Sequence, residues 1–449
     1  MVTRHATPET LEERLVYWAI VSTWGLWLLG ALYVVGPVIG YGLILLFVAR
    51  FLGLRQDEPR RPLWIPIGVA LWLVGMAVML LALVIGHLDF ELGIGQLIKS
   101  SIGWAKGWAL LAIFPIAGAV LSIRPQIIYR ATAVLALQTL MLVPVFWVAG
   151  LAGLPMELYS SPLQALGGPG KEFFDVTLYA IDNVDGSLRW RFFAPWATAA
   201  AFAASIGFLF ALYEKAHFWK IVGILSAIIV CWMTGSRSSI VALPVVIGSV
   251  LVMSNLHRPG MWLALAFGAT AAILMTDLIL MTIEDFQNAF SAARAASSRV
   301  RATLNHIGYY RWYTEAYWFG HGVVERGPHL VEFMPIGSHH TWYGLLYVKG
   351  LAGFLALAVP LAWTVFELSV KAQCDRVARA ALCTTLALAM FSFADNLEIV
   401  TYLIWPGLLL IGIGLRRRFC NPYAPRLGAS ARWTAAEQAA VHAPRPGLA

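Results

Sequence analysis

Charged residues are scarce in this sequence, at 12% of its 449 residues. A soluble globular domain carries about 25%. Cysteine is also scarce: the four cysteines form no Cys-x-x-Cys pair, which argues against a disulfide framework or a thiolate metal site. Hydrophobic residues, by contrast, make up 59% of the chain. These proportions exclude an ordinary soluble domain and indicate an integral membrane protein.

Apolar runs of about 20 residues recur along the chain, and a run of that length spans the hydrocarbon core of a bilayer. The sequence therefore predicts an all-α polytopic membrane protein with about twelve transmembrane helices within residues 15–415. A cytoplasmic N-terminus (1–14) precedes them, and a disordered cytoplasmic tail (416–449) rich in Ala, Pro and Arg follows. The predicted spans are 15–34, 36–54, 63–86, 104–123, 131–153, 195–213, 219–235, 238–255, 261–282, 342–366, 379–394 and 399–415.

Basic residues concentrate on one side of the predicted membrane. With the N-terminus in the cytoplasm, 20 of the 32 Lys and Arg residues are cytoplasmic, 11 are outside, and Lys349 lies within a span. This distribution follows the positive-inside rule, so the net charge of +8 is a topology signal and not a nucleic-acid-binding surface. Two outer connections are long, 154–194 and 283–341, and long ordered connections commonly carry function. Apolar residues at helical spacing in 284–304 predict an amphipathic helix at the outer surface.

Several arginines lie outside, against the topology signal. Arg189 and Arg191 precede a predicted helix that enters from the outer side, Arg237 lies in a tight turn, and Arg311 lies in the second long loop. The planar, permanently charged guanidinium suits a phosphate or pyrophosphate group, and a charge at membrane level is a candidate for function. Snorkelling towards lipid headgroups and pairing with outer carboxylates are the structural alternatives.

Two adjacent histidines, His339 and His340, occupy the point where the second long loop re-enters the membrane. A neutral imidazole in this position can accept a proton from a sugar hydroxyl held in a cleft. A surface residue or a hydrogen-bonded helix cap is the alternative interpretation. The outer histidines and carboxylates show no His-x-x-x-His, His-Glu-x-x-His or Asp-x-Asp spacing, so we expect no metal ion.

Aromatic residues are frequent in the second long loop. Trp312 and Trp318, together with Trp342 just after the loop, are candidates for stacking against sugar rings. Anchoring of the loop at the membrane interface explains them equally well. Within the predicted spans, Asp277 and Lys349 lie at matched depths with opposite charges, and we expect them to pair.

The order of these motifs resembles the O-antigen ligase and polymerase superfamily of bacterial envelope polysaccharide enzymes. The segments 320–322 (GHG), 339–343 (HHTWY) and 350–353 (GLAG) resemble the family's G-x-G motif, its H-N-x-[YF]-L motif and the glycine pair that follows. His340 stands where the family usually has Asn or Ser, so which imidazole acts stays open, although the spacing to Gly350 favours His339.

Two further landmarks resemble the family. Residues 234–238 (TGSRS) resemble its TGSR turn. Arg189 or Arg191, ahead of Pro195, resembles the arginine that precedes the family's proline-bearing helix start, and the spacing does not rank the two.

The resemblance implies a GT-C-like arrangement with a helical periplasmic loop between spans 9 and 10. It also implies a metal-independent, inverting glycosyltransferase that needs no cofactor. The donor would be an undecaprenyl-pyrophosphate-linked oligosaccharide and the acceptor a hydroxyl of a second glycan, at the periplasmic face of the bacterial inner membrane. His339, or alternatively His340, would be the general base, and arginines would bind the pyrophosphate: Arg189, Arg191, Arg237 and Arg311.

Within this family, the first interpretation is a polymerase of exopolysaccharide, capsule or O-antigen, working with a flippase and a chain-length regulator among membrane lipids. A ligase that transfers glycan to the lipid A core, or a protein O-oligosaccharyltransferase, is the alternative. A polysaccharide transporter or flippase is the competing class. A transporter places its charges near the bilayer midplane and often shows internal repeats, and the sequence shows neither feature.

Overall fold

The computed structural model describes residues 7–54, 64–181, 186–292, 295–331 and 333–419, and it is mostly helical. The rest of the predicted tail, 420–449, and the first six residues lie outside the described residues. The helices are α1 Leu11–Val21, α2 Thr23–Leu28, α3 Leu32–Phe51, α4 Ile67–Asp89, α5 Ile94–Lys106, α6 Leu110–Val120, α7 Pro125–Leu151, α8 Ala197–Tyr213, α9 His217–Thr234, α10 Arg237–Met253, α11 Pro259–Leu274, α12 Thr276–Ala292, α13 Ala295–Glu315, α14 Thr341–Ala372, α15 Arg376–Phe391 and α16 Leu397–Leu415.

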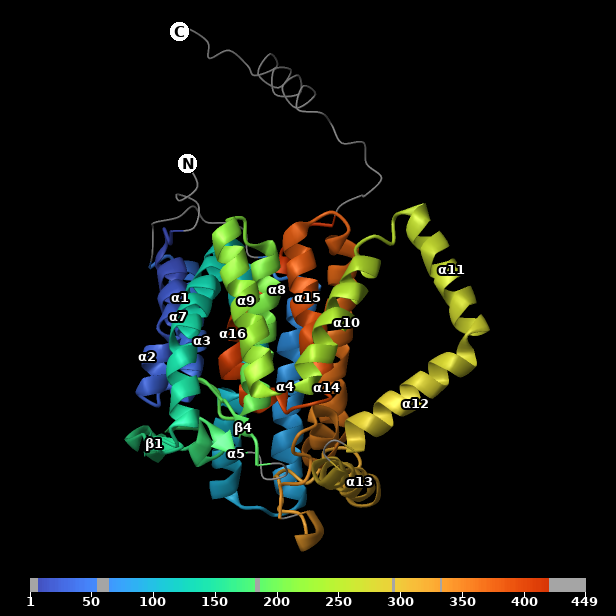
Figure 1. The fold of residues 1–449 in the computed structure, drawn as a ribbon. Helices are drawn as coiled ribbons and strands as arrows, with labels where there is room; N and C mark the ends of the chain where they lie inside the picture. The colour runs from blue at the N-terminus through green and yellow to red at the C-terminus, as the bar shows by residue number, and fades with distance from the viewer. Residues whose placement is uncertain (1–6, 55–63, 182–185, 293–294, 332, 420–449) are drawn as a thin grey trace, which may run out of the picture.

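Short strands occur in the connection 154–194. The strands β1 (Glu157–Ser160) and β2 (Asp175–Thr177) form one antiparallel pair, and β3 (Ala180–Ile181) and β4 (Leu188–Arg189) form another. The two pairs fold this connection over one end of the helical bundle, where β1 and β4 lie in Figure 1. Arg189 is the last residue of β4, so the second strand pair sets its position.

Among the described residues, seven helices are long and apolar enough to cross a membrane, or eight if the bent pair α11–α12 is one span. The long helices are α3, α4, α7, α9, α14, α16 and the combined segment Ile94–Val120. The shorter apolar helices α8 and α10 fall where two more spans were predicted. The structure thus agrees with the prediction of an all-α membrane-embedded protein, whereas it confirms neither twelve spans nor a GT-C-like arrangement.

Two predicted boundaries differ from the observed helices. Gly36-Pro37, predicted as the turn between the first two spans, lies inside α3. The chain turns earlier, at Gly30, which has a φ of 63°. Gly36 instead permits close packing, because a Cβ at this position would lie only 2.7 Å from the Cβ of Tyr402 in α16. The glycine of this Gly-Pro pair therefore allows close helix packing, and the prediction of a turn here is wrong.

The predicted ninth span and the amphipathic helix after it also differ from the observed elements. The predicted span 261–282 is broken between α11 and α12, which meet at 78°. In Figure 1, α11 leads away from the bundle and α12 returns towards it. The predicted helix 284–304 is divided between α12 and α13, and residues 293–294 lie outside the described residues. Val300 and Leu304 of α13 pack against Val331 and are buried, so this face contacts protein and not the membrane surface.

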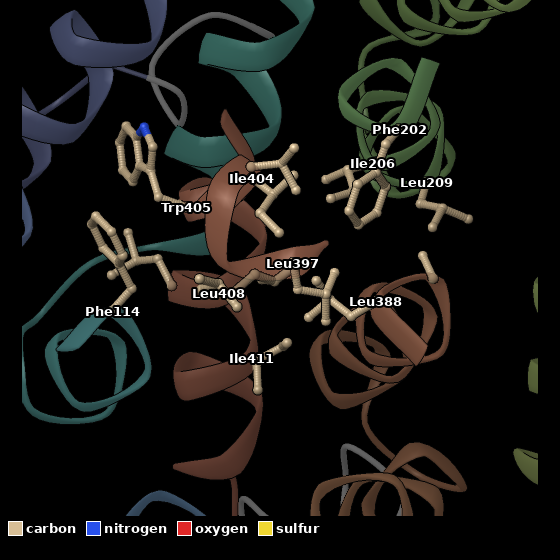
Figure 2. Close-up of a cluster of buried hydrophobic side chains, with 14 of the residues drawn as sticks. Phe114, Phe202, Ile206, Leu209, Leu388, Leu397, Ile404, Trp405, Leu408 and Ile411 are labelled. Atoms are coloured by element: carbon tan, nitrogen blue, oxygen red, sulfur yellow. The ribbon is translucent and has the colours of Figure 1, made fainter. Parts of the chain in front are cut away.

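The core of the bundle surrounds α16. Figure 2 shows side chains of α16 packed with side chains of α6, α8 and α15. The residues labelled there are Phe114, Phe202, Ile206, Leu209, Leu388, Leu397, Ile404, Trp405, Leu408 and Ile411. Gly118 of α6 faces the Leu409 carbonyl, and Gly412 of α16 faces the Pro115 carbonyl, so closely that no Cβ would fit at either position. Small residues let membrane helices approach and gain van der Waals contact.

Lys349 is buried in α14 at 5% exposure. The charge that interacts with it is Glu398 of α16, and Asp277 is exposed at the start of α12. The predicted Asp277–Lys349 pair is therefore wrong, because α11 leads away from the bundle and Asp277 lies at the outlying bend between α11 and α12. Asp277 and Lys349 were predicted at equal membrane depth, but residues at equal depth need not be in contact.

Candidate functional site

The segment around His339 and His340 is tied to the turn between α15 and α16. Thr341 donates its backbone N–H to the Ser392 carbonyl (2.9 Å) and its hydroxyl to the Asp395 carbonyl (2.7 Å). The same hydroxyl accepts from the N–H of Leu397 at 3.0 Å. The hydrogen bonds of Thr341 therefore hold the start of α14 against the start of α16 at one end of the bundle.

The two adjacent histidines have different environments. His340 is the N-cap of α14: its Nδ1 accepts from the Tyr343 N–H at 3.4 Å, and its ring packs against Tyr343 and Phe393. His339 has a φ of 65°, unusual for a residue with a side chain, and its ring has no hydrogen-bond partner among the described residues. Such strained residues cluster at functional sites. The cap interpretation thus applies to His340, and His339 keeps both ring nitrogens available.

The pKa of His339 also differs from that of an ordinary surface histidine. Burial, together with the positive charge of Arg301 on α13, lowers the pKa of His339 to about 4. Because the ring is neutral above that pH, it can accept a proton at neutral pH. Arg301 also acts on the buried Asp395, whose pKa burial raises to about 6 against the opposing effects of its hydrogen bonds and of Arg301.

Asp395 connects the turn between α15 and α16 to the start of α8. Its carboxylate accepts from the indole N–H of Trp196 (2.7 Å) and from the backbone N–H of Asn396 (2.8 Å). Trp196 is the N-cap residue of α8. This contact joins the segment that carries Arg191 and Pro195 to the segment that carries His339.

Sequence reasoning missed Asp395 and did not single out Arg301 from the other outer arginines. A signal for Asp395 was present, because a carboxylate in a four-residue connection between two apolar runs lies at membrane level and needs a partner. No comparable signal marked Arg301. Only the packing of α13 onto the loop before α14 places its charge near His339.

Arg189 lies against the TGSR turn. Its Nε and Nη2 donate to the Thr234 carbonyl at 3.2 and 3.0 Å, where α9 ends with Gly235 in the left-handed conformation. The Ser236 hydroxyl lies 3.1 Å from those of Ser238 and Ser239. Arg189 thus ties β4 to this turn and satisfies a carbonyl at a helix end.

Arg237 is the first residue of α10 and is half-buried. The exposed backbone N–H groups and the dipole at a helix start both favour an anion nearby. Arg237 and the serine hydroxyls of the turn therefore form a polar, positively charged end to an otherwise apolar helix. This geometry is compatible with phosphate, and the predicted role of Arg237 in pyrophosphate binding stays a prediction.

Arg191, like Arg189, is half-buried. Its Nη1 donates to the Pro195 carbonyl at 3.3 Å, and burial lowers its pKa while Glu172 and Asp175 oppose that change. The next residue, Phe192, is buried with a φ of 52°. Arg191 therefore lies in a strained segment between carboxylates and the start of α8.

An apolar pocket of about 90 Å³ lies between helices of the bundle and reaches Phe192, the residue next to Arg191. It is lined by residues of α1, α2, α3, α7, α8, α9 and α16, and by Phe192 and Phe193. A smaller pocket shares Leu32, Phe193 and Tyr402 with it and reaches Glu172, Asp175 and Pro195. The apolar interior is thus adjacent to the polar segment that carries Arg191.

Arg311 is held by protein groups on three sides. It donates to Glu315 (2.9 Å), Glu325 (2.7 Å) and the Tyr347 hydroxyl (2.8 Å). The two carboxylates compensate its charge, which gives Arg311 a scaffold role between α13 and α14. Its predicted contribution to pyrophosphate binding stays a prediction.

The three predicted sugar-binding tryptophans differ in accessibility. Trp312 is 7% exposed and donates its indole N–H to the Tyr317 carbonyl. Trp342 is half-buried and donates to the Ser392 hydroxyl at 2.8 Å. Trp318 is 63% exposed. Of the three, Trp318 presents the largest open surface for a ligand.

The GHG segment fills a break in α14. Gly350 has a φ of 62° and a ψ of −163° inside that helix. Across the break, His321 and Gly322 donate N–H groups to the carbonyls of Tyr347 and Val348, both at 2.9 Å. Leu351 and Ala352 donate to Tyr317 (2.9 Å) and Trp318 (3.0 Å) in return. The loop thus replaces the helical hydrogen bonds that the break removes.

Among the described residues, no group of three His, Cys, Asp or Glu side chains is arranged to hold a metal ion. No protein-family model matches the chain, and no curated protein matches it in sequence. The chemistry of the site is therefore interpreted from its own residues.

Proposed function

We propose that this protein is a membrane-embedded glycosyltransferase that polymerises envelope polysaccharide from an undecaprenyl-pyrophosphate-linked donor at the periplasmic face of the inner membrane. The observation that carries the proposal is His339, a neutral imidazole on a residue with a left-handed backbone, at the end of an apolar bundle beside the charge of Arg301. A proton acceptor next to a fixed cation suits the attack of a hydroxyl on a donor with an anionic leaving group.

In the proposed reaction, a nitrogen of His339 takes the proton of an acceptor sugar hydroxyl. The hydroxyl oxygen forms a bond to the anomeric carbon of the donor as the bond from that carbon to the pyrophosphate oxygen breaks. The electron pair leaves with the lipid pyrophosphate, so no cofactor is required. A single displacement of this kind inverts the anomeric configuration.

The charges of the site support an anionic donor. Arg301 lowers the basicity of His339. A pyrophosphate that neutralised Arg301 would raise that basicity, so the base would become effective when the donor is bound. Arg189, Arg191 and Arg237 lie on the neighbouring segments and are the further candidates for contacting the pyrophosphate.

The interior pocket supports a lipid-linked donor. Its walls are mostly apolar and lie between membrane helices, and the smaller pocket beside it reaches the segment of Arg191. A lipid-linked donor likewise has an apolar hydrocarbon chain joined to a polar head.

The direct test uses purified protein and a radiolabelled lipid-linked glycan with no other component. We expect His339→Ala to reduce glycan transfer by about 10²- to 10⁴-fold, the usual contribution of a general base. The matched control is His340→Ala, which removes a helix cap at a cost of about 1 kcal/mol and keeps transfer activity. Full transfer activity in His339→Ala, or its loss only in His340→Ala, would overturn the assignment of the base.

The products distinguish a polymerase from the alternatives within the same chemistry. In a deletion strain, attached glycans of a single repeat unit would indicate a polymerase. Unattached full-length polymer would indicate a ligase or a protein O-oligosaccharyltransferase. Translocation of lipid-linked glycan without any transfer in purified vesicles would indicate a transporter.

A further inference from the structure

His321 is buried at 1% exposure between two aromatic rings, although it lies in the GHG segment of a loop. Its ring centroid lies 4.4 Å from that of Tyr347 and 5.0 Å from that of Phe90. Its Nδ1 lies 3.0 Å from the Tyr347 carbonyl oxygen, and its Nε2 lies 2.9 Å from Oε2 of Glu315. Both ring nitrogens therefore face a hydrogen-bond acceptor.

This geometry favours a ring that carries a proton on both nitrogens. A carbonyl oxygen only accepts, and a carboxylate also only accepts when it is ionised. Burial raises the pKa of Glu315, but the hydrogen bonds from His321 and Arg311 outweigh burial and hold that pKa below its ordinary value. Glu315 is therefore ionised at neutral pH, and both contacts of His321 form together only when both ring nitrogens carry a proton.

His87 in α4 provides the contrast within the same region. It is equally buried, and its Nδ1 lies 2.8 Å from the Leu83 carbonyl. Its Nε2, however, lies 2.9 Å from the Ser100 hydroxyl, which can donate as well as accept. A neutral His87 therefore satisfies both of its partners, whereas a neutral His321 would leave its Nε2 lone pair facing a carboxylate.

The charged groups around His321 come from every element that packs on it. Glu315 and Arg311 belong to α13, Glu325 to the loop that follows, and Tyr347 to α14. His87 faces Gly322 from α4. A hydrogen bond from Arg311 lowers the pKa of Glu325, so two carboxylates balance Arg311 and a protonated His321. Loss of the His321 proton leaves this cluster with an unbalanced negative charge.

The cluster lies where it controls the position of the proposed catalytic loop. His321 and Gly322 also fill the break in α14 through their backbone N–H groups. On the other side, the backbone carbonyl of Glu325 accepts from the N–H of Ile336, which ties the start of the loop to the segment that ends at His339. The same α13 that carries Arg311 and Glu315 carries Arg301.

We propose that His321, in its imidazolium form, is a positioning residue that clamps the GHG segment and α13 onto the break in α14, and that loss of its proton releases this clamp. The clamp holds the loop of His339 and the charge of Arg301 in their relative positions. Its effect on transfer rests on the proposed function, whereas the pH-dependent docking does not.

The test measures hydrogen exchange of the four backbone amides that cross the break, in the full protein in nanodiscs between pH 5.5 and pH 9. Rates are divided by the intrinsic rate at each pH. The amides belong to His321, Gly322, Leu351 and Ala352. Because one proton is released on undocking, we expect protection to fall with rising pH, by up to tenfold per pH unit.

Two variants make the measurement specific. Asn at position 321 can still donate to the Tyr347 carbonyl but cannot titrate, so His321→Asn should give weaker protection that does not change with pH. His87→Asn is the matched control and should keep the pH dependence of the wild type. A flat profile in the wild type, or an unchanged pH dependence in His321→Asn, would overturn the proposal.

Transfer activity is followed over the same pH range. We expect the wild type to lose activity at the pH where protection falls. His321→Asn should not show this loss of activity at high pH. If protection depends on pH as expected but no variant transfers glycan at any pH, the clamp stands and the proposed function fails.

Discussion

Replacement of Gly350 by alanine should separate α14 from the loop that fills its break. Gly350 has φ 62° and ψ −163°, a region that only glycine adopts readily and that costs a side-chain-bearing residue about 1–3 kcal/mol. An added Cβ would also overlap the backbone of Trp318 and Phe319. Because these are backbone atoms, side-chain rearrangement cannot relieve the overlap.

The magnitude follows from the hydrogen bonds that the loop would lose. Four backbone hydrogen bonds cross the break, and each contributes about 1 kcal/mol net. With the conformational strain added, Gly350→Ala should destabilise this region by about 5 kcal/mol. Gly320 faces the same contact from the loop, since its own Cβ would overlap the backbone at Val348 and Lys349, so Gly320→Ala should have a similar effect.

Thermal unfolding of the purified variants in one detergent measures this difference. Gly42 of α3 is the control, because a Cβ there meets no atom within 4 Å, and Gly42→Ala should be neutral or stabilising by up to about 1 kcal/mol. Hydrogen exchange should show the loss of protection in Gly350→Ala confined to the break and the loop. A stability of Gly350→Ala equal to that of Gly42→Ala would refute the reasoning.

Three further outcomes follow from the structure. Lys371, fully buried, donates to Glu367, so Lys371→Met should cost about 3–5 kcal/mol by leaving a buried carboxylate unpaired, measured as a lower melting temperature. The pKa of His339 is lowered to about 4. Because kcat/KM reports the free enzyme, before a donor neutralises Arg301, kcat/KM should not decline with falling pH until the pH approaches about 4. A decline of kcat/KM centred near pH 6.5 would contradict this. Trp196→Phe removes the indole donor to Asp395 and should destabilise by about 1–3 kcal/mol, with Trp147→Phe as a comparison that breaks no hydrogen bond seen in the described chain.

The composition and the spacing of apolar runs were enough to predict a helical membrane protein. Hydrocarbon offers no hydrogen-bond partners, so a spanning segment must be apolar and helical over a defined length, and both properties are visible in one dimension. The GHG and GLAG segments also marked real features, because Gly320 and Gly350 occupy places where no side chain fits. These predictions depended on local properties of the chain.

What the sequence alone left open involved contacts between distant residues. It could not tell that His340 caps α14 while His339 stays unbonded, nor that Arg301 acts on both His339 and Asp395. It paired Lys349 with the wrong carboxylate for the same reason. Local spacing determines which residues share a helix, whereas the packing of α13, α14 and the α15–α16 turn decides which charges meet and which imidazole remains available as a base.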